Sequence, residues 1–208
     1  MFGYSVLLAG NGQKLAIGAR YNDSNGDDSG QVKVFEWVEA TSSYQQLGDS
    51  FLGDAASDVF GWSVSFLRDG TTLAIGANKK GEASGQVKIF AWDEEASIFE
   101  QIGQSLYGKA PGSVFGYSVA LLSEGKTLAI GVPGGPFFAA YVEVYACNGV
   151  SSVYKQLGQS LCGDEDSYNQ FGSAVALAAN GRVLSVGAPY SDRNGADSGR
   201  VEVFDTEL

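Results

Sequence analysis

One sequence unit occurs four times along this chain, and this repeat constrains the fold more than any other feature. Each copy opens on a Phe-Gly pair, and the pairs are Phe2-Gly3, Phe60-Gly61, Phe115-Gly116 and Phe171-Gly172. A second, apolar block follows each opening at a constant distance, at residues 15–19, 73–77, 128–132 and 184–188. A period of 55–58 residues built from short apolar runs indicates a repeat array, for which the β-propeller blade is the leading candidate.

Within one copy the pattern predicts four strands. An Asn11-Gly12 hairpin signal separates the first strand from the apolar block at 15–19. Gly18 lies in this block, where it allows another backbone to approach closely. After a polar loop, residues 31–35 alternate between polar and apolar, as strands do, and a fourth strand is expected at 44–48. No segment has the helical period, so each copy is expected to form one antiparallel blade.

We therefore expect an all-β fold, a β-propeller built of four-stranded antiparallel blades. Residues 1–208 form one repeat array, with blades at about 2–59, 60–114, 115–170 and 171–208. The last blade is incomplete, which gives three full blades plus a three-stranded fourth. Because an incomplete ring exposes apolar faces, the chain is interpreted as part of a larger ring. Two alternatives stay open: two chains complete each other, or a four-bladed ring closes imperfectly.

The pairing of Phe-Gly with Gly187-Ala188-Pro189 resembles the FG-GAP repeat family, and Gly131-Val132-Pro133 nearly repeats the second motif. This family includes the seven-bladed propeller of integrin alpha chains and many secreted repeat proteins of bacteria and algae. The resemblance implies a seven-bladed ring and an extracellular or cell-surface adhesion or ligand-binding scaffold, although no signal peptide precedes the first repeat. It also implies calcium between the first and second strands, but Gly10-Asn11-Gly12 is too short and too poor in carboxylates for that role.

The charge balance limits the classes of partner that the chain is expected to bind. Lys and Arg number 13 against 24 Asp and Glu, a net charge of −11, which argues against nucleic acid binding. The chain has no histidine, which removes His-based catalytic triads, general bases and zinc ligands. No run of 18 apolar residues occurs, so no membrane insertion is expected.

The two cysteines replace packing residues of other copies, so buried free thiols are expected rather than a disulfide. A hairpin near residues 148–152 would place Cys162 opposite about residue 138, far from Cys147, and a disulfide needs Cα atoms within about 7 Å.

The loops between the second and third strands hold the candidate site residues. Two of them share the pattern Asp, Asn-Gly, Asp-Ser-Gly, which admits either a calcium-binding loop or a hydrogen-bonded turn. A further acidic stretch between blades is interpreted as a solvated turn. The ligand or metal candidates are Asp23, Asn25, Asp27, Asp28, Asp192, Asn194, Asp197, Asp164 and Asp166.

Aromatic residues recur at equivalent positions of the copies and favour packing between blades over sugar stacking. They are Phe35, Trp37, Tyr44, Phe90, Trp92, Phe99, Tyr145 and Tyr154. Phe137-Phe138 has no counterpart in other copies and is interpreted as a contact surface.

These observations predict a non-catalytic binding or adhesion module of a secreted or cell-surface protein. Its ligand is expected to be a protein or a glycan, bound on the face where the blade-linking loops meet those between second and third strands. One alternative is an enzyme-associated hydrolase or lyase domain that uses loop carboxylates or a segment outside this chain. The other is a purely structural repeat scaffold.

Overall fold

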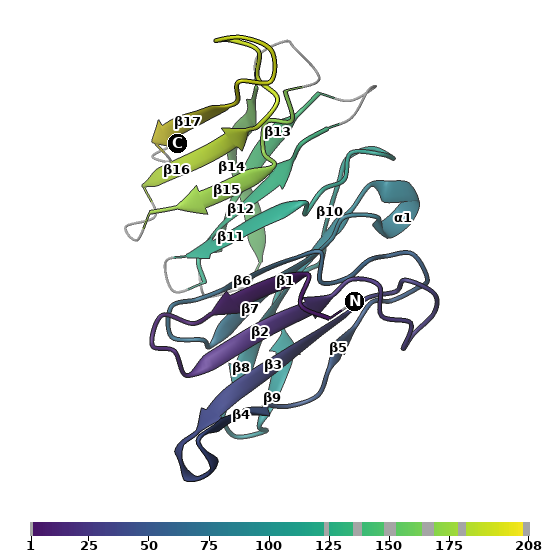
Figure 1. Ribbon diagram of the computed structural model, residues 1–208, viewed down its shortest axis with the longest axis vertical. Helices are drawn as coiled ribbons and strands as arrows, with labels where there is room; N and C mark the ends of the chain where they lie inside the picture. The colour runs from purple at the N-terminus through teal and green to yellow at the C-terminus, as the bar shows by residue number, and fades with distance from the viewer. Residues whose placement is uncertain are drawn as a thin grey trace.

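The computed structural model describes residues 2–122, 125–134, 139–147, 153–163, 169–178 and 182–205. The strands within these ranges form four antiparallel sheets, each of which is one blade (Figure 1). The first blade also contains a short 3₁₀ turn, η1 (Glu39–Thr41). Its strands are β1 (Ser5–Leu8), β2 (Lys14–Ala19), β3 (Gln31–Val38), β4 (Ser43–Gln46) and β5 (Phe51–Leu52).

The other three blades repeat this order. The second includes one helical turn, α1 (Lys80–Ala83), and has strands β6 (Ser63–Phe66), β7 (Thr72–Ala77), β8 (Gln86–Asp93), β9 (Ile98–Gln101) and β10 (Leu106–Tyr107). The third consists of β11 (Ser118–Leu122), β12 (Thr127–Val132), β13 (Tyr141–Cys147) and β14 (Tyr154–Cys162). The fourth consists of β15 (Ala174–Leu177), β16 (Val183–Ala188) and β17 (Arg200–Asp205). The predicted propeller of three complete blades and a three-stranded fourth is therefore confirmed.

The outermost strand differs from the expected single strand in the first two blades. In the first, β4 pairs with β3 at Phe35, whereas β5 pairs with the same strand near Val32, and the outermost strand is interrupted between them. Gly48 lies in this break with φ +67°, a left-handed conformation that interrupts a strand and suits glycine. In the third blade β14 is continuous, and a bulge between Val142 and Val144 absorbs the irregularity.

The blades pack face to face in chain order, with one apolar cluster at each junction. Leu73 and Ile75 of β7 are fully buried against the first blade, and Leu128 and Ile130 of β12 are fully buried in the cluster shared with the second. Leu184 and Val186 of β16 complete the series against the third blade. Each fully buried side chain of this size contributes about 1.5–3 kcal/mol, so these junctions carry most of the apolar stabilisation.

The two repeat motifs meet at every junction between blades. Ser5 Oγ donates a hydrogen bond to the carbonyl oxygen of Gly61, over 2.8 Å. A Cβ atom on Gly18 would lie only 2.3 Å from that same oxygen, so no larger residue fits. The prediction that glycine at this position allows a close backbone approach is confirmed at this junction.

The two ends of the array expose apolar faces. Val6 and Leu8 of β1 are exposed on the first blade, and Val201 and Val203 of β17 are exposed on the fourth. In Figure 1 the first blade (purple) and the fourth (yellow-green) lie in opposite halves of the molecule. The number of blades in a complete ring stays a prediction.

The cysteines are free, but two details of their prediction are wrong. Cys162 lies opposite Tyr141 rather than near residue 138, because β14 has three residues between Leu157 and Leu161 where β13 has only Glu143, and this bulge shifts the register. Cys162 is exposed and Cys147 is half-buried, because both lie at the ends of strands rather than in an apolar cluster. Among the described residues, no helix is long and apolar enough to cross a membrane.

Candidate functional site

The two acidic loops share one internal hydrogen-bond network. The Asp23 carboxylate accepts a hydrogen bond from the backbone amide of Asp28, over 2.8 Å, and Asp192 accepts the equivalent bond from Asp197, over 2.7 Å. Asp28 and Asp197 both have positive φ, which aspartate tolerates better than most residues. A serine closes each turn, since Ser29 Oγ and Ser198 Oγ donate to backbone carbonyl oxygens seven residues earlier. These bonds are those of a closed polar turn.

No metal centre is evident in these loops. Within the part of the chain that the structure describes, no group of three or more His, Cys, Asp and Glu side chains could hold a metal ion. The candidates Asp27 and Asn194 are exposed, like the aspartates of the same two loops. Asp164 and Asp166 lie outside the described residues. A calcium site in these loops therefore stays a prediction.

The loop between the second and third strands is bound to the loop that joins two blades. The Asn25 side-chain amide donates to the carbonyl oxygen of Gly53, over 2.7 Å. The amides of Ser57 and Val59 donate to the carbonyls of Asp27 and Asp28, over 2.8 and 3.0 Å. In the first blade these two loops therefore form one continuous surface, and its role as a binding face stays a prediction.

Ion pairs fasten this surface to the second blade. Lys80 Nζ lies 2.7 Å from Asp58 and 3.5 Å from Asp54, and Lys88 Nζ lies 2.6 Å from Asp54. Burial alone would raise the pKa of Asp54, but Lys88 and Lys80 outweigh it and lower that pKa. Since each charge has an opposite partner, these groups serve to join blades.

A buried carboxylate breaks the repeat pattern in the third blade. Glu143 is fully buried in β13, where the first two blades have lysine. One of its oxygens accepts from the Tyr145 hydroxyl over 2.7 Å, and the other accepts from Ser160 Oγ over 3.0 Å and pairs with Lys109. Burial, followed by the bond to Glu143, raises the pKa of Tyr145. With both oxygens engaged, this carboxylate is a structural group, as buried charges usually are when paired.

Most of the aromatic residues singled out in the sequence pack within or between blades. The rings of Trp92 and Phe99 are 4.9 Å apart, and Trp37 packs on Tyr44 at 5.2 Å. Tyr154 is buried and donates to the carbonyl of Gly125. Their interpretation as packing residues is confirmed, while Phe137-Phe138 lies outside the described residues.

A different set of aromatic rings forms a row across three blades. Tyr4, Trp62 and Tyr117 each follow directly after a Phe-Gly pair. The ring of Trp62 lies 5.2 Å from each of the other two, with interplanar angles of 50° and 51°. Tyr4 is 40% exposed, so solvent reaches this aromatic row. Burial is the main cause that raises the pKa of Tyr117, and the nearby Tyr4 and Tyr190 contribute.

Arg20 packs into this aromatic row. Its guanidinium carbon lies 3.6 Å from the ring centroid of Tyr4, 4.2 Å from that of Trp62 and 4.3 Å from that of Tyr21. Its Nε is buried without a hydrogen-bond partner, and no carboxylate of the described residues pairs with it. Asn78, at the equivalent position of the second blade, also has an unpartnered buried oxygen, Oδ1. Stacking on aromatic faces desolvates a cation and leaves the edge of its fork ready for an oxyanion.

Sequence reasoning missed this site. The signal was present, because the residue after Phe-Gly is aromatic in three copies and becomes Ser173 only in the fourth. Arg20 carried no such signal, since no other copy has arginine at its position.

Four antiparallel sheets that pack face to face in chain order define a β-propeller. The family model of the FG-GAP repeat matches residues 161–204, from the end of β14 into β17. A comparison with curated proteins finds no match.

Several solved structures have a similar fold but low sequence identity to this chain. A proposed 6-phosphogluconolactonase from Bacteroides fragilis gives a TM-score of 0.61 at 15% identity over 96% of this chain and 49% of its own. Hydrazine synthase from Kuenenia stuttgartiensis gives a TM-score of 0.58 at 14% identity, over 98% of this chain and 46% of its own. The β-propeller domain of the Trilobed protease from Pyrococcus furiosus gives a TM-score of 0.53 at 12% identity, over 98% of this chain and 55% of its own. That domain is described as having an open Velcro topology. The chain spans about half the length of these proteins, and the similarity concerns the fold alone.

Proposed function

We propose that this chain is a non-catalytic binding module that takes a glycan at the aromatic row of Tyr4, Trp62 and Tyr117, beside Arg20. The observation that carries the proposal is a solvent-accessible row of rings around a cation whose Nε has no partner. Sugar rings present apolar faces that stack on aromatic side chains, while their polar groups need donors. Arg20 supplies such donors.

The unpaired charge of Arg20 favours a glycan that carries a carboxylate. A guanidinium fork binds a carboxylate with two parallel hydrogen bonds, which are among the stronger ones in proteins. The net charge of −11 disfavours a long polyanion, because it would be repelled by the rest of the surface. A short oligosaccharide with one or two acidic sugars is therefore the ligand class that fits best.

Several features support a binding module over an enzyme. Glu143 has both oxygens engaged, Asp54 is held by two lysines, and the exposed Asp23 and Asp192 cap their own turns. The sequence has no histidine to serve as a general base. We also infer that the parent protein acts outside the cell or at its surface, and the support for this is the FG-GAP match.

The test is calorimetric titration of the folded chain with matched acidic and neutral oligosaccharides, such as oligogalacturonates and galactose oligomers. Arg20→Gln should weaken binding of the acidic series about 10- to 100-fold, since a hydrogen bond to a charged group contributes about 1.5–3 kcal/mol. It should change the neutral series little, whereas Trp62→Ala should weaken both. Lys155→Gln, an exposed cation of β14, serves as the control.

Three results would refute the proposal. If the chain binds neither series, a structural scaffold is favoured. If it binds a protein partner with an affinity that Arg20→Gln and Trp62→Ala leave unchanged, the binding site lies elsewhere on the surface. Cleavage of the oligosaccharide would favour an enzyme.

A further inference from the structure

Two polar side chains of the aromatic row occupy the same position in consecutive repeats. Arg20 follows directly after β2, and Asn78 follows directly after β7. In the first blade the amide of Tyr4 donates to the carbonyl oxygen two residues before Arg20, over 3.0 Å. In the second blade the amide of Trp62 donates to the carbonyl oxygen two residues before Asn78, over 3.1 Å. Both side chains therefore leave the backbone at equivalent points, beside the ring of their own blade.

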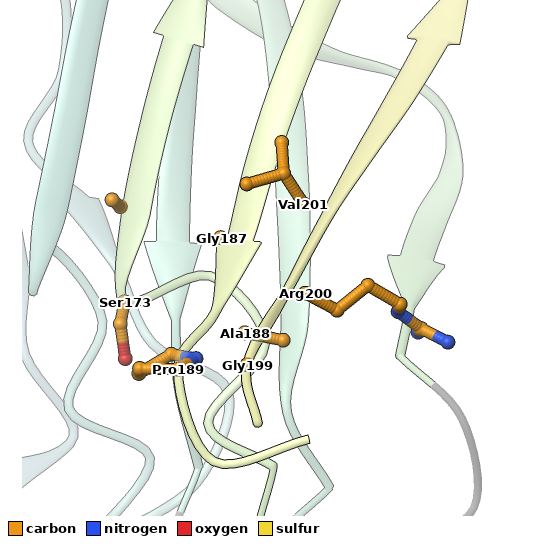
Figure 2. Close-up of a pocket in the computed structure, with 8 residues that line it drawn as sticks. Ser173, Gly187, Ala188, Pro189, Gly199, Arg200 and Val201 are labelled. Atoms are coloured by element: carbon orange, nitrogen blue, oxygen red, sulfur yellow. The ribbon is translucent and has the colours of Figure 1, made fainter. Parts of the chain in front are cut away.

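The fourth blade shows that these two repeat positions are neighbours. There they hold Ser173 and Pro189, which line one cavity together (Figure 2). In the third and fourth copies the position of Arg20 is occupied by Pro133 and Pro189, which have no hydrogen-bonding group in the side chain. Of the four copies, only the first two therefore offer a side-chain hydrogen bond at this position.

The rings of the row repeat as regularly as the polar groups. Trp62 lies 5.2 Å from Tyr4 and 5.2 Å from Tyr117, with interplanar angles of 50° and 51°. Arg20 stacks on the first of these two pairs. By the repeat, Asn78 belongs to the second pair, Trp62 and Tyr117. The row thus consists of two equivalent ring pairs, one with a cation and one with a neutral amide.

Electrostatics connects the two ring pairs. Burial is the main cause that raises the pKa of Tyr117, and Arg20 is near enough to counteract part of that rise. The cation of the first pair therefore acts on the far ring of the second pair. A ligand that spans both pairs would contact Arg20 and Asn78 together.

The burial of Asn78 is destabilising in the free chain. The residue is 2% exposed, and its Oδ1 has no hydrogen-bond partner among the described residues. Asn169 is 3% exposed, but its Oδ1 accepts a hydrogen bond from the amide of Phe171, over 2.9 Å. Unpaired buried oxygens are rare in folded proteins because they lose water without gaining a partner. The oxygen of Asn78 is therefore an acceptor that a ligand can satisfy.

We propose that Asn78 forms a second subsite, in which its Oδ1 accepts a hydrogen bond from a hydroxyl group of the sugar next to the acidic one. This inference rests on the proposed function, in which Arg20 binds the carboxylate. A second carboxylate at Asn78 would lose water without meeting a charge, whereas a hydroxyl group can donate to the oxygen. The site therefore selects a unit of one acidic and one neutral sugar over a run of acidic sugars.

Binding at this subsite requires a local rearrangement. Because Oδ1 of Asn78 is covered in the free chain, a bound sugar must displace a neighbouring group. We expect the ring of Trp62 to move, since both ring pairs share it. Tryptophan fluorescence should therefore change on binding, and this change should be absent in Trp62→Phe.

The experiment is calorimetric titration of the folded chain with digalacturonate, galactobiose and galacturonosyl-galactose in both orders of linkage. One order of the mixed disaccharide should bind about 5- to 150-fold more tightly than digalacturonate, since a buried group left unpaired weakens binding by about this factor. Asn78→Arg repeats the cation of the first pair and should reverse this preference. Asn78→Leu should weaken binding of the mixed disaccharide about 2- to 12-fold, the loss of one neutral hydrogen bond. Lys155→Gln again serves as the control.

A second measurement uses the free chain. Asn78→Leu removes the unpaired oxygen with little change in side-chain volume and should raise Tm by a few degrees. Asn169→Leu is the matched control, because it removes an equally buried oxygen that has a partner, and it should lower Tm.

Three outcomes would overturn the proposal. A lower Tm in Asn78→Leu, as in Asn169→Leu, would show that Oδ1 has a partner in the free chain, such as a buried water molecule. Equal binding of the mixed disaccharide by Asn78→Leu and the wild type, or a wild-type preference for digalacturonate, would remove the second subsite and leave the role of Arg20 intact. If the wild-type chain binds none of the disaccharides, the proposed function fails, and this inference fails with it.

Discussion

The contact between the two repeat motifs makes a sharp prediction about two glycines at equivalent positions. Gly76 lies in β7 at an occupied junction, and Gly187 lies in β16 at the open end. A Cβ atom on Gly76 would lie 2.2 Å from the carbonyl oxygen of Gly116 and 2.3 Å from Ser63 Oγ. A Cβ atom on Gly187 meets only ordinary contacts. The same change to alanine should therefore have opposite consequences at the two sites.

The expected magnitudes follow from this geometry. In Gly76→Ala the backbone of the next blade must move, and such overpacking costs about 1–3 kcal/mol. The hydrogen bond from Ser63 to Gly116 is then lost or lengthened, which adds about 0.5–1.5 kcal/mol. In Gly187→Ala the main effect is a less flexible unfolded chain, which stabilises by about 0.4–1 kcal/mol.

Thermal unfolding followed by circular dichroism measures the difference. For a chain of this size 1 kcal/mol corresponds to about 2–4 °C in Tm, so Gly76→Ala should melt roughly 5–15 °C below the wild type. Gly187→Ala should melt at the wild-type temperature or a few degrees above it. Equal losses in both variants would refute the reasoning, because they would show that glycine is required by the strand itself and not by the neighbouring blade.

Three further changes test the polar contacts, each by equilibrium unfolding. Lys109→Met leaves Glu143 buried without its cation and should lower the free energy of unfolding by about 1–3 kcal/mol. An unchanged unfolding midpoint would show that the hydrogen bonds from Tyr145 and Ser160 are enough to stabilise the buried carboxylate. Because its pKa is lowered, ionised Asp54 stabilises the fold at pH values above the ordinary pKa of 3.8, and this contribution is lost as the pH falls through the pKa of the folded chain. Asp54→Asn should therefore make the free energy of unfolding depend less on pH in this acid range. Asp23→Ala removes the cap of the turn and should cost about 0.5–1.5 kcal/mol, with or without chelator. A calcium-dependent rise in Tm that Asp23→Ala abolishes would instead assign a metal site.

The sequence predicted the elements and their order because its signals are local and repeated. The Asn11-Gly12 turn and the alternation at 31–35 each reflect a backbone requirement within a few residues. The break in the outermost strand was missed, although Gly48 recurs as Gly103 and Gly158 with positive φ. Its conformation depends on how the strand meets β3, which no local pattern reveals.

The candidate site was harder to predict than the fold. The composition of the acidic loops predicted ligand or metal candidates there, yet the carboxylates of Asp23 and Asp192 accept hydrogen bonds within their own turns. The three rings of the aromatic row come from three blades, with Trp62 58 positions after Tyr4 and Tyr117 55 positions after Trp62, and only the packing of blades brings them together around Arg20. A search for aromatic residues at equivalent positions would have found Tyr4, Trp62 and Tyr117 but not the cation among them.

Two departures of the fourth copy from the repeat fall on the same junction. After Phe-Gly, the first three copies have an aromatic residue and a serine, whereas the fourth has Ser173 and Ala174. In the first and second blades both side chains contact the following blade, through stacked rings and a hydroxyl-to-carbonyl hydrogen bond. A blade that follows the fourth therefore loses two contacts that the earlier junctions make.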